Sequence, residues 1–258
     1  MRISRAESNT SNEKLLQKYF TEKIASRKTK KTSKDSLEYS LRRGLTAIGE
    51  LSIVSTDISD LQKAIDAADP DQRQRQLVTY LNSMLHWLGR KDKLQPQMKE
   101  ARDVKFIPLN QLGKVIERLP SRAWQVAVII AVNSGLRIGE LFALDARSLM
   151  AKGFKVDFQI ERDGSRSRPK RGKRRTVAVF TEAIELFEEW LDVKDQITQE
   201  ERNYAARILR RACMAAYPKN PEWHLRFHDL RHSYAIAACD KGMTLEWLAK
   251  QWSAHRND

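Results

Sequence analysis

The sequence has few cysteines, no long apolar segment and no secretory signal. Cys213 and Cys239 are its two cysteines, and their spacing fits no metal or redox motif. We expect both to be small hydrophobic residues in a reducing compartment, which predicts a cytoplasmic protein. No run of about 18 apolar residues exists, so we expect no membrane-spanning helix. The polar start of the chain has no apolar core of the signal type.

Acidic residues are also in deficit. The 258 residues include 33 Asp and Glu against 47 Lys and Arg, a formal net charge of +14. A chain this basic favours polyanions, of which nucleic acid is the commonest in a cell. An anionic membrane surface is the rival partner, but the chain has no long basic amphipathic segment with Trp or Phe on its apolar face. We therefore expect a DNA partner and no membrane partner.

Composition and periodicity divide the chain into four segments. Residues 1–35 are polar and predict a basic N-terminal arm whose Lys28, Lys30 and Lys31 lie along DNA, although a solvated tail fits equally well. Residues 36–90 predict a helical domain, because leucines recur at helical spacing over 36–51 and 71–88, with another helix at 58–68. Residues 91–104 are charged and contain a proline, which predicts a linker.

The remaining segment, residues 105–258, predicts a larger domain that is mostly helical. A helix beginning at Pro120–Ser121 is apolar all round, so it should be buried, and Asn133–Gly135 should end it. Apolar residues alternate over 155–161 and 175–180, which predicts two strands. Further helices are expected at 110–119, 138–144, 181–192, 199–217, 229–241 and 245–251. The predicted fold class is mainly α, with a small β-hairpin or sheet, in two domains.

The segment Ser134-Gly-Leu-Arg-Ile-Gly-Glu-Leu141 is the first candidate for chemistry. Gly135 permits a sharp turn that would project Arg137 from the end of the buried helix. Glu140, three residues further on, can hold the guanidinium on the same helical turn. The alternative is an ordinary surface salt bridge after a helix C-cap.

The second candidate is the hairpin Arg162–Arg175, in which eight of fourteen residues are Lys or Arg. Such a charge density favours a DNA-facing loop over a merely solvated one. A lysine at the tip of the hairpin could also give a proton to a reacting phosphate. The residues that we expect to contact DNA here are Arg166, Arg168, Arg171, Lys173, Arg174 and Arg175.

The third candidate is His228-Asp-Leu-Arg-His232, followed by His255 near the end of the sequence. His228 and Arg231 are neighbours on one helical turn and can converge on one anion. His224, His228 and His232 are spaced four apart, but a cation beside Arg231 is disfavoured and no further ligand has suitable spacing. We expect no metal and no cofactor. His232 can support the site or simply pack in the core.

In order and spacing, these segments resemble the tyrosine recombinase (phage integrase) family. Ser134–Leu141 matches the family's first arginine motif, and His228–His232 matches its His-x-x-Arg motif. Lys170 falls where the family keeps a hairpin lysine, with Lys173 as an alternative alignment. His255 falls where the family usually has Leu-Gly-His. The resemblance covers the second domain, an integrase-type catalytic domain, while residues 36–90 fit the family's DNA-clamping core-binding domain in size and position.

The resemblance implies metal-free transesterification at a DNA phosphate. Arg137 and Arg231 would neutralise the non-bridging oxygens, Lys170 would protonate the 5′-oxygen leaving group, and Glu140 would orient Arg137. His228 and His255 would hydrogen-bond the phosphate or handle the proton of the attacking tyrosine. The implied function is site-specific recombination, the integration or excision of a mobile element. The implied assembly is a homotetramer on DNA for the complete protein, which accessory DNA-bending proteins can join.

The sequence departs from the family at the attacking group. The family's tyrosine follows the last histidine closely, whereas no tyrosine follows Tyr234 here, and Tyr234 is expected to pack in the core. We therefore expect this chain to lack the nucleophile, to be inactive by itself and to be a monomer or weakly associated. A truncated recombinase and a natural end are both compatible with the sequence. Two alternatives stay open: a non-catalytic DNA-binding remnant of an integrase and a type IB topoisomerase.

Overall fold

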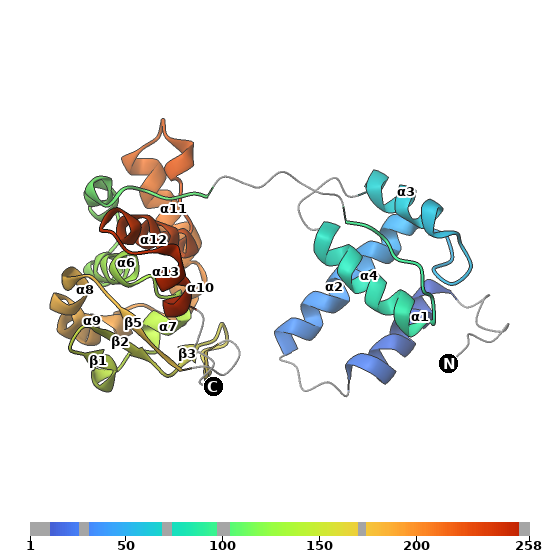
Figure 1. Ribbon diagram of the computed structural model, residues 1–258, viewed down its shortest axis with the longest axis horizontal. Helices are drawn as coiled ribbons and strands as arrows, with labels where there is room; N and C mark the ends of the chain where they lie inside the picture. Colours follow the sequence, from blue (N-terminus) through green and yellow to red (C-terminus); the bar gives the residue numbers. More distant parts are fainter. Residues whose placement is uncertain (1–10, 26–30, 69–73, 97–103, 170–173, 253–258) are drawn as a thin grey trace. The chain divides into compact units, whose positions relative to one another are not determined.

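The computed structural model describes residues 11–25, 31–68, 74–96, 104–169 and 174–252. The chain divides into two compact units, residues 1–101 and residues 102–258 (Figure 1). Within the described ranges, no helix is long and apolar enough to cross a membrane. The fold class predicted from the sequence is confirmed, because helices dominate both units and the few strands belong to unit 2.

All the secondary-structure elements in the described residues of unit 1 are helical. Its elements are α1 Asn12–Tyr19, the π-helical turn η1 Phe20–Ile24, α2 Lys31–Ile48, α3 Ile58–Ala68 and α4 Gln74–Trp87. The predicted leucine repeats form its core: Leu41 of α2 and Leu81 and Leu85 of α4 are at most 1% exposed. Burial of these apolar faces between packed helices stabilises the unit.

Residues 12–24 correct the prediction of a basic arm over 1–35. They are helical, and Leu15, Leu16 and Tyr19 are each only 1% exposed. These three side chains share one helical face, and the Tyr19 ring packs edge-on against Trp87 with the ring centroids 5.3 Å apart. Charged residues surround this apolar face in the sequence and obscure it. Lys28 and Lys30 lie outside the described residues.

The predicted linker is also too long at its beginning. Residues 91–96 lie on unit 1, where Leu94 is 2% exposed and the Asn82 amide exchanges two hydrogen bonds of 2.9 Å with its backbone. Arg90 donates hydrogen bonds to the carbonyls of Ile53 and Thr56 at 2.9 and 2.8 Å. Lys91 and Lys93 are exposed, so the segment looks charged although its apolar residue points inward. The boundary between the units follows Ala101.

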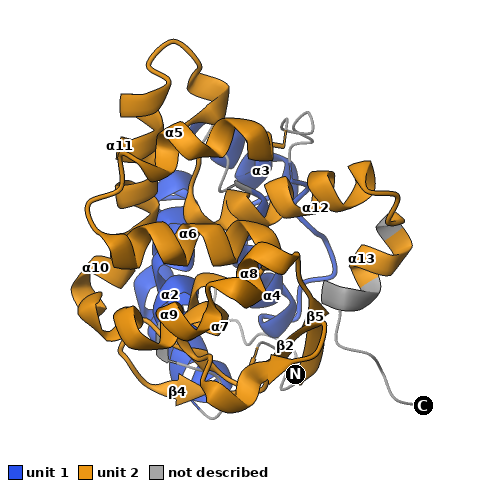
Figure 2. Cartoon of the chain, turned by 90° about the vertical axis from the view of Figure 1, so that its left-hand side faces the viewer, with its two compact units in different colours: residues 1–101 blue, residues 102–258 orange. Residues whose placement is uncertain are grey.

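Unit 2 is built around helix α6, Arg122–Ser134, which crosses its middle (Figure 2). Ser121 caps the helix by accepting a hydrogen bond from the Trp124 N–H at 3.4 Å. Side chains from all round α6 are buried, as its apolar sequence predicts. The other helices are α5 Leu112–Ile116, α7 Ile138–Phe142, α8 Thr181–Glu185, α9 Phe187–Val193, α10 Gln199–Asn203, α11 Ala205–Ala216, α12 Leu230–Asp240 and α13 Leu245–Trp252. Short 3₁₀ turns are η2 Leu109–Gln111, η3 Ala146–Ser148, η5 Lys194–Gln196, η6 Pro221–Trp223 and η7 Phe227–Asp229.

Two small antiparallel sheets complete unit 2. The first has the order β1-β2-β5, from Leu149–Met150, Gly153–Val156 and Arg175–Ala178, and the second pairs β3 Gln159–Ile160 with β4 Arg166–Ser167. The single strand predicted over 155–161 is therefore two strands in different sheets. Between them the ring of Phe158 lies under the Arg166 guanidinium, 4.0 Å from its carbon to the ring centroid, and faces the second sheet.

Substitution of Gly153 tests whether β2 and β5 must approach each other closely. A Cβ atom added there would lie 2.1 Å from the Val177 carbonyl oxygen, so Gly153→Ala must push the two strands apart. We expect a loss of about 2–3 kcal/mol in the free energy of unfolding, measured by urea denaturation. Gly113→Ala in α5 is the control, because its Cβ would meet nothing within 4 Å and alanine favours a helix by up to about 1 kcal/mol. Equal effects of the two substitutions would contradict this account.

Candidate active site

Arg137 is placed by the turn that ends α6. Gly135 adopts a left-handed conformation with φ 63°, and its N–H donates to the Ala131 carbonyl at 2.9 Å. This conformation suits glycine, which has no Cβ to clash. The backbone is extended again at Arg137, which caps the N-terminus of α7. The predicted sharp turn is confirmed.

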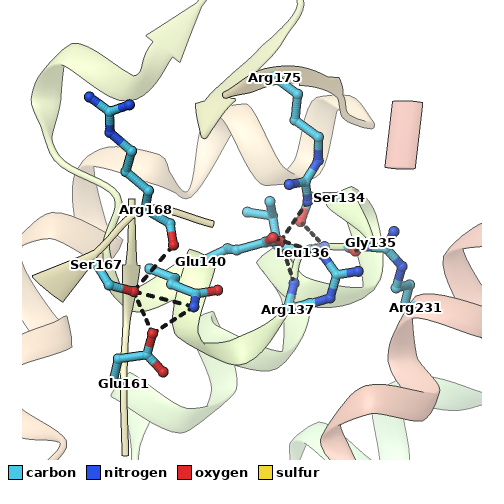
Figure 3. A network of polar contacts seen from close by, with 11 residues as sticks. Ser134, Gly135, Leu136, Arg137, Glu140, Glu161, Ser167, Arg168, Arg175 and Arg231 are labelled. Carbon is cyan, nitrogen blue, oxygen red and sulfur yellow. Dashed lines mark hydrogen bonds and ion pairs between the residues drawn. The ribbon is translucent and has the colours of Figure 1, made fainter. Parts of the chain in front are cut away.

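Glu140 is fully buried and lies between two arginines (Figure 3). Its Oε1 accepts from Arg137 Nη1 at 2.9 Å, while its Oε2 accepts from the Arg137 N–H at 3.0 Å and from Arg175 Nη2 at 2.7 Å. Burial alone would raise the pKa of Glu140. The hydrogen bond and charge of Arg175, followed by those of Arg137, outweigh burial and hold the pKa below its ordinary value. Glu140 is therefore ionised and orients Arg137, as expected from the sequence.

Arg231 reaches the same turn from α12. Its Nη1 donates to the Gly135 carbonyl oxygen at 2.8 Å, across 96 residues of sequence (Figure 3). The residue is 6% exposed. Burial, and next the charge of Arg137, lower the pKa of Arg231 to about 9. A buried guanidinium with a second cation nearby favours an anion as a ligand.

His228 lies beside Arg231, in the 3₁₀ turn η7 that precedes α12. Its ring is exposed and stands edge-on to His232, with the centroids 5.8 Å apart. Partial burial lowers the pKa of His228, and the charges of His232, Arg231 and Arg137 lower it further. The imidazole is therefore neutral near pH 7 and able to accept a proton. Asp229, 1% exposed, anchors the turn by accepting from the Arg226 N–H at 2.8 Å.

Tyr234 packs in the core, as predicted. It is fully buried, and its hydroxyl donates to the Ala178 carbonyl at 2.8 Å. Burial raises the pKa of Tyr234 to about 12. A hydroxyl that is buried, bonded and hard to ionise cannot attack a phosphate from solvent.

The basic hairpin separates into residues with different environments. Arg166 pairs with Asp145 at 3.1 Å, the side chain of Arg174 is 55% exposed, and Arg168 is exposed as well. Arg175 corrects the prediction of a DNA contact, because its side chain is only 6% exposed and is bound to Glu140. Four predicted site residues lie outside the described residues: Lys170, Arg171, Lys173 and His255. The side chain of Lys31 lies outside them as well, although its backbone begins α2.

The alternation of the strand could have revealed the place of Arg175. Residues two apart on a strand face the same side, and Arg175 is two residues before Val177, which is fully buried. The density of basic residues in the hairpin concealed this signal.

His224, the remaining histidine of the series spaced four apart, makes its contact with the end of α11. Its Nε2 lies 3.0 Å from the Tyr217 carbonyl oxygen, at the end of α11. Among the described residues, no group of three or more His, Cys, Asp or Glu side chains could hold a metal ion.

A cavity of about 490 Å³ opens beside His228. Its lining includes the apolar Ile138 and Phe227, and its charged residues are Arg162, Arg202 and Arg226 together with Glu161. Gly139 and Ile160 also line it, and their backbones approach so closely that a Cβ on Gly139 would lie 2.6 Å from the Ile160 carbonyl oxygen. Arginines thus outnumber acidic residues in this lining, and an excess of positive charge suits a polyanion with several phosphates.

Comparisons with known proteins agree with this geometry. A model of the phage integrase family matches residues 107–258. No curated protein sequence matches the chain significantly.

Several solved structures share the fold over both units. An integrase of the transposon Tn1549, in complex with transposon right end DNA, has a TM-score of 0.74 at 15% identity, covering 95% of this chain and 91% of that one. A lambda integrase dimer bound to a COC′ core site has a TM-score of 0.70 at 14% identity, covering 96% and 93%. A lambda integrase tetramer bound to a Holliday junction has a TM-score of 0.69 at 12% identity, covering 98% and 81%. At these identities the likeness establishes the fold.

The pKa of His228 tests the electrostatics of the site. In an NMR titration the imidazole should titrate below its ordinary range, and Arg137→Met should raise its pKa because one neighbouring positive charge is removed. Arg122→Met is the control: Arg122 begins the 13-residue helix α6, about 20 Å from its Gly135 end. An Arg137→Met variant in which His228 titrates as in the unmodified chain would contradict the proximity of the two groups.

Proposed function

Since the chain belongs to the phage integrase family, we propose that it serves site-specific DNA recombination by transesterification at a backbone phosphate. The reaction would integrate or excise a mobile element. The observation that carries this proposal is the hydrogen bond from Arg231 to the Gly135 carbonyl, which brings the two arginine motifs together. Arg137 and Arg231 then flank a place for one anion, with His228 at its side.

The proposed chemistry is the one that membership of the family implies. A tyrosine oxygen would attack phosphorus, the bond to the 5′-oxygen would break, and a 3′-phosphotyrosyl bond would form. Arg137 and Arg231 would stabilise the charge on the non-bridging oxygens, which fixed donors do effectively. Lys170 would protonate the departing 5′-oxygen, while His228 and His255 would bond the phosphate or take the phenol's proton. Attack by a partner strand's 5′-hydroxyl would reverse these steps and rejoin DNA.

Double-stranded DNA is the proposed partner. The net charge of +14 and the exposed side chains of Arg166, Arg168 and Arg174 support it. We propose the same contact for five further basic residues, Arg171, Lys173, Lys28, Lys30 and Lys31, and a DNA clamp for unit 1. The lambda integrase tetramer on a Holliday junction supports a homotetramer on DNA for the complete protein. We also propose that the protein acts in the cytoplasm, where its two free cysteines stay reduced.

Tyr234 is not the attacking group in this proposal. Tyr234 is excluded by its burial and its hydrogen bond, and no tyrosine follows it in the sequence. This chain should therefore bind and activate the phosphate without forming a covalent bond to DNA.

A scan of neutralised phosphates tests whether Arg137 and Arg231 bind the same DNA phosphate. A duplex selected from a random pool for binding to this chain would carry one methylphosphonate at each position in turn. We expect one phosphate whose neutralisation weakens binding by about tenfold or more, and whose effect disappears in both Arg137→Met and Arg231→Met. We call this position the shared phosphate. Binding would be measured by fluorescence anisotropy.

Arg174→Met is the control for this scan. It removes one exposed positive charge, so it should weaken binding to all duplexes alike and lower the salt slope by about 1. Different sensitive phosphates for Arg137→Met and Arg231→Met, or none, would contradict a common site.

Cleavage with an external nucleophile tests the chemistry without a tyrosine. Hydrogen peroxide, with a chelator present, supplies an anion that can attack phosphorus in place of a phenolate. The chain should then cut DNA at the shared phosphate and release a 5′-hydroxyl end, detected on a sequencing gel. Arg137→Ala and Arg231→Ala should slow this cleavage at least about 100-fold, because each removes a donor to the transition state.

Tyr234→Phe tests whether the Tyr234 hydroxyl stabilises the fold or takes part in cleavage. It should lower the free energy of unfolding by about 1 kcal/mol through its lost hydrogen bond, with cleavage changed less than twofold. Loss of cleavage in Tyr234→Phe, or a phosphotyrosyl adduct on this chain without peroxide, would overturn the assignment of the nucleophile. Absence of cleavage in the unmodified chain would favour a non-catalytic DNA-binding protein.

A further inference from the structure

We propose that Arg175 is a positioning residue: by sharing the Glu140 carboxylate, it keeps Arg137 directed toward the phosphate. Arg175 then acts through Glu140 and Arg137 and does not touch DNA. This inference rests on the proposed function, because it concerns the same phosphate site.

The first support is the distribution of charge around the turn. Arg137, Arg175 and Arg231 carry three positive charges, and Glu140 is the carboxylate bonded to the first two. The side chains of Arg175 and Glu140 are 6% and 0% exposed, whereas that of Arg137 is 37% exposed. The buried Arg175–Glu140 pair is thus the fixed part of the network, and Arg137 is the member that reaches solvent.

The second support is the division of the carboxylate's hydrogen bonds. Arg175 takes Oε2 at 2.7 Å, a position that it shares with the Arg137 backbone N–H at 3.0 Å. The Arg137 guanidinium bonds Oε1 through one nitrogen, Nη1, at 2.9 Å. A carboxylate and a guanidinium pair best through two parallel bonds. Arg175 prevents that arrangement, so Arg137 keeps donors for a phosphate.

The sheet holds Arg175 in this place. Arg175 begins β5 opposite Val156 of β2, and Val177 follows on the same buried face. Residues two apart on a strand point to one side, so the pairing of β2 with β5 directs Arg175 toward Glu140. The position of the guanidinium is therefore set by backbone pairing and does not depend on DNA.

Removing Arg175 would leave Glu140 with one arginine. A buried carboxylate that loses a partner is costly, so the remaining guanidinium is drawn to it. Arg137 would then pair with both oxygens and withdraw from the phosphate. The effect requires the negative charge of Glu140, and it should vanish once that charge is removed.

The test measures the ratio of affinities for two duplexes, one with the charged shared phosphate and one with a methylphosphonate there. Arg175→Met should reduce this ratio at least about fivefold and leave affinity for the neutral duplex within twofold. Arg175→Lys, which keeps the charge, should retain a larger ratio than Arg175→Met. In the Glu140→Gln background, Arg175→Met should have no further effect on the ratio, as a double-mutant cycle for a coupled pair requires.

Arg122→Met is the matched control. Arg122 also pairs with a glutamate, Glu189, at 2.6 and 2.7 Å, but its side chain is 53% exposed at the far end of α6. Its removal should leave the ratio unchanged. Partial unfolding of any variant lowers both affinities alike and cancels in the ratio, so a purely structural role of Arg175 would not change it.

Two results would overturn the inference. One is an Arg175→Met variant with the ratio of the unmodified chain, and the other is an equal effect of Arg175→Met in the presence and absence of the Glu140 charge. Failure of the proposed function looks different, since the unmodified chain would then show no shared phosphate in the scan.

Discussion

The buried carboxylate of Glu140 is the group around which the candidate active site is arranged. A buried anion is unfavourable unless charges and hydrogen bonds compensate for lost hydration. Here Arg137 and Arg175 compensate for it, and the backbone N–H of Arg137 adds a third bond. The carboxylate thereby fixes the first turn of α7 and joins it to β5. The geometry of Arg137 is thus linked, through Glu140 and Arg175, to the pairing of β5 in the sheet.

The site could be predicted from the sequence where local rules determine the structure. Gly135 must allow a left-handed turn, and Glu140 lies three residues after Arg137, so that segment predicted its own geometry. The bond from Arg231 to the Gly135 carbonyl spans 96 residues, and no local rule gives such a contact. The resemblance to integrases implied only that Arg137 and Arg231 act on the same phosphate, and it did not predict this bond. Arg175 was misplaced because the charge of the hairpin outweighed the alternation of the strand.

The fold shows the same division between local and distant information. The leucine repeats of α2 and α4 predicted helices that the structure confirms. In contrast, α1 and residues 91–96 were mistaken for an arm and a linker. In both segments, the apolar residues Leu15, Leu16 and Leu94 are few and surrounded by charges. Their burial depends on neighbours that are distant in sequence, which an average over composition cannot show.

The electrostatics of the free site favour phosphate before any DNA arrives. Burial and the charge of Arg137 lower the pKa of Arg231 to about 9. Burial, and then the charges of His232, Arg231 and Arg137, lower the pKa of His228. An anion between the arginines would relieve both effects, so binding should raise both pKa values. Glu140 supplies this relief only in part, because its charge raises the pKa of Arg231 less than burial and the charge of Arg137 lower it. A carboxylate placed nearer Arg231 would stabilise the free protein and compete with the phosphate. Because Glu140 is bonded to Arg137 and Arg175 and not to Arg231, the site keeps a positive charge that can attract a DNA phosphate.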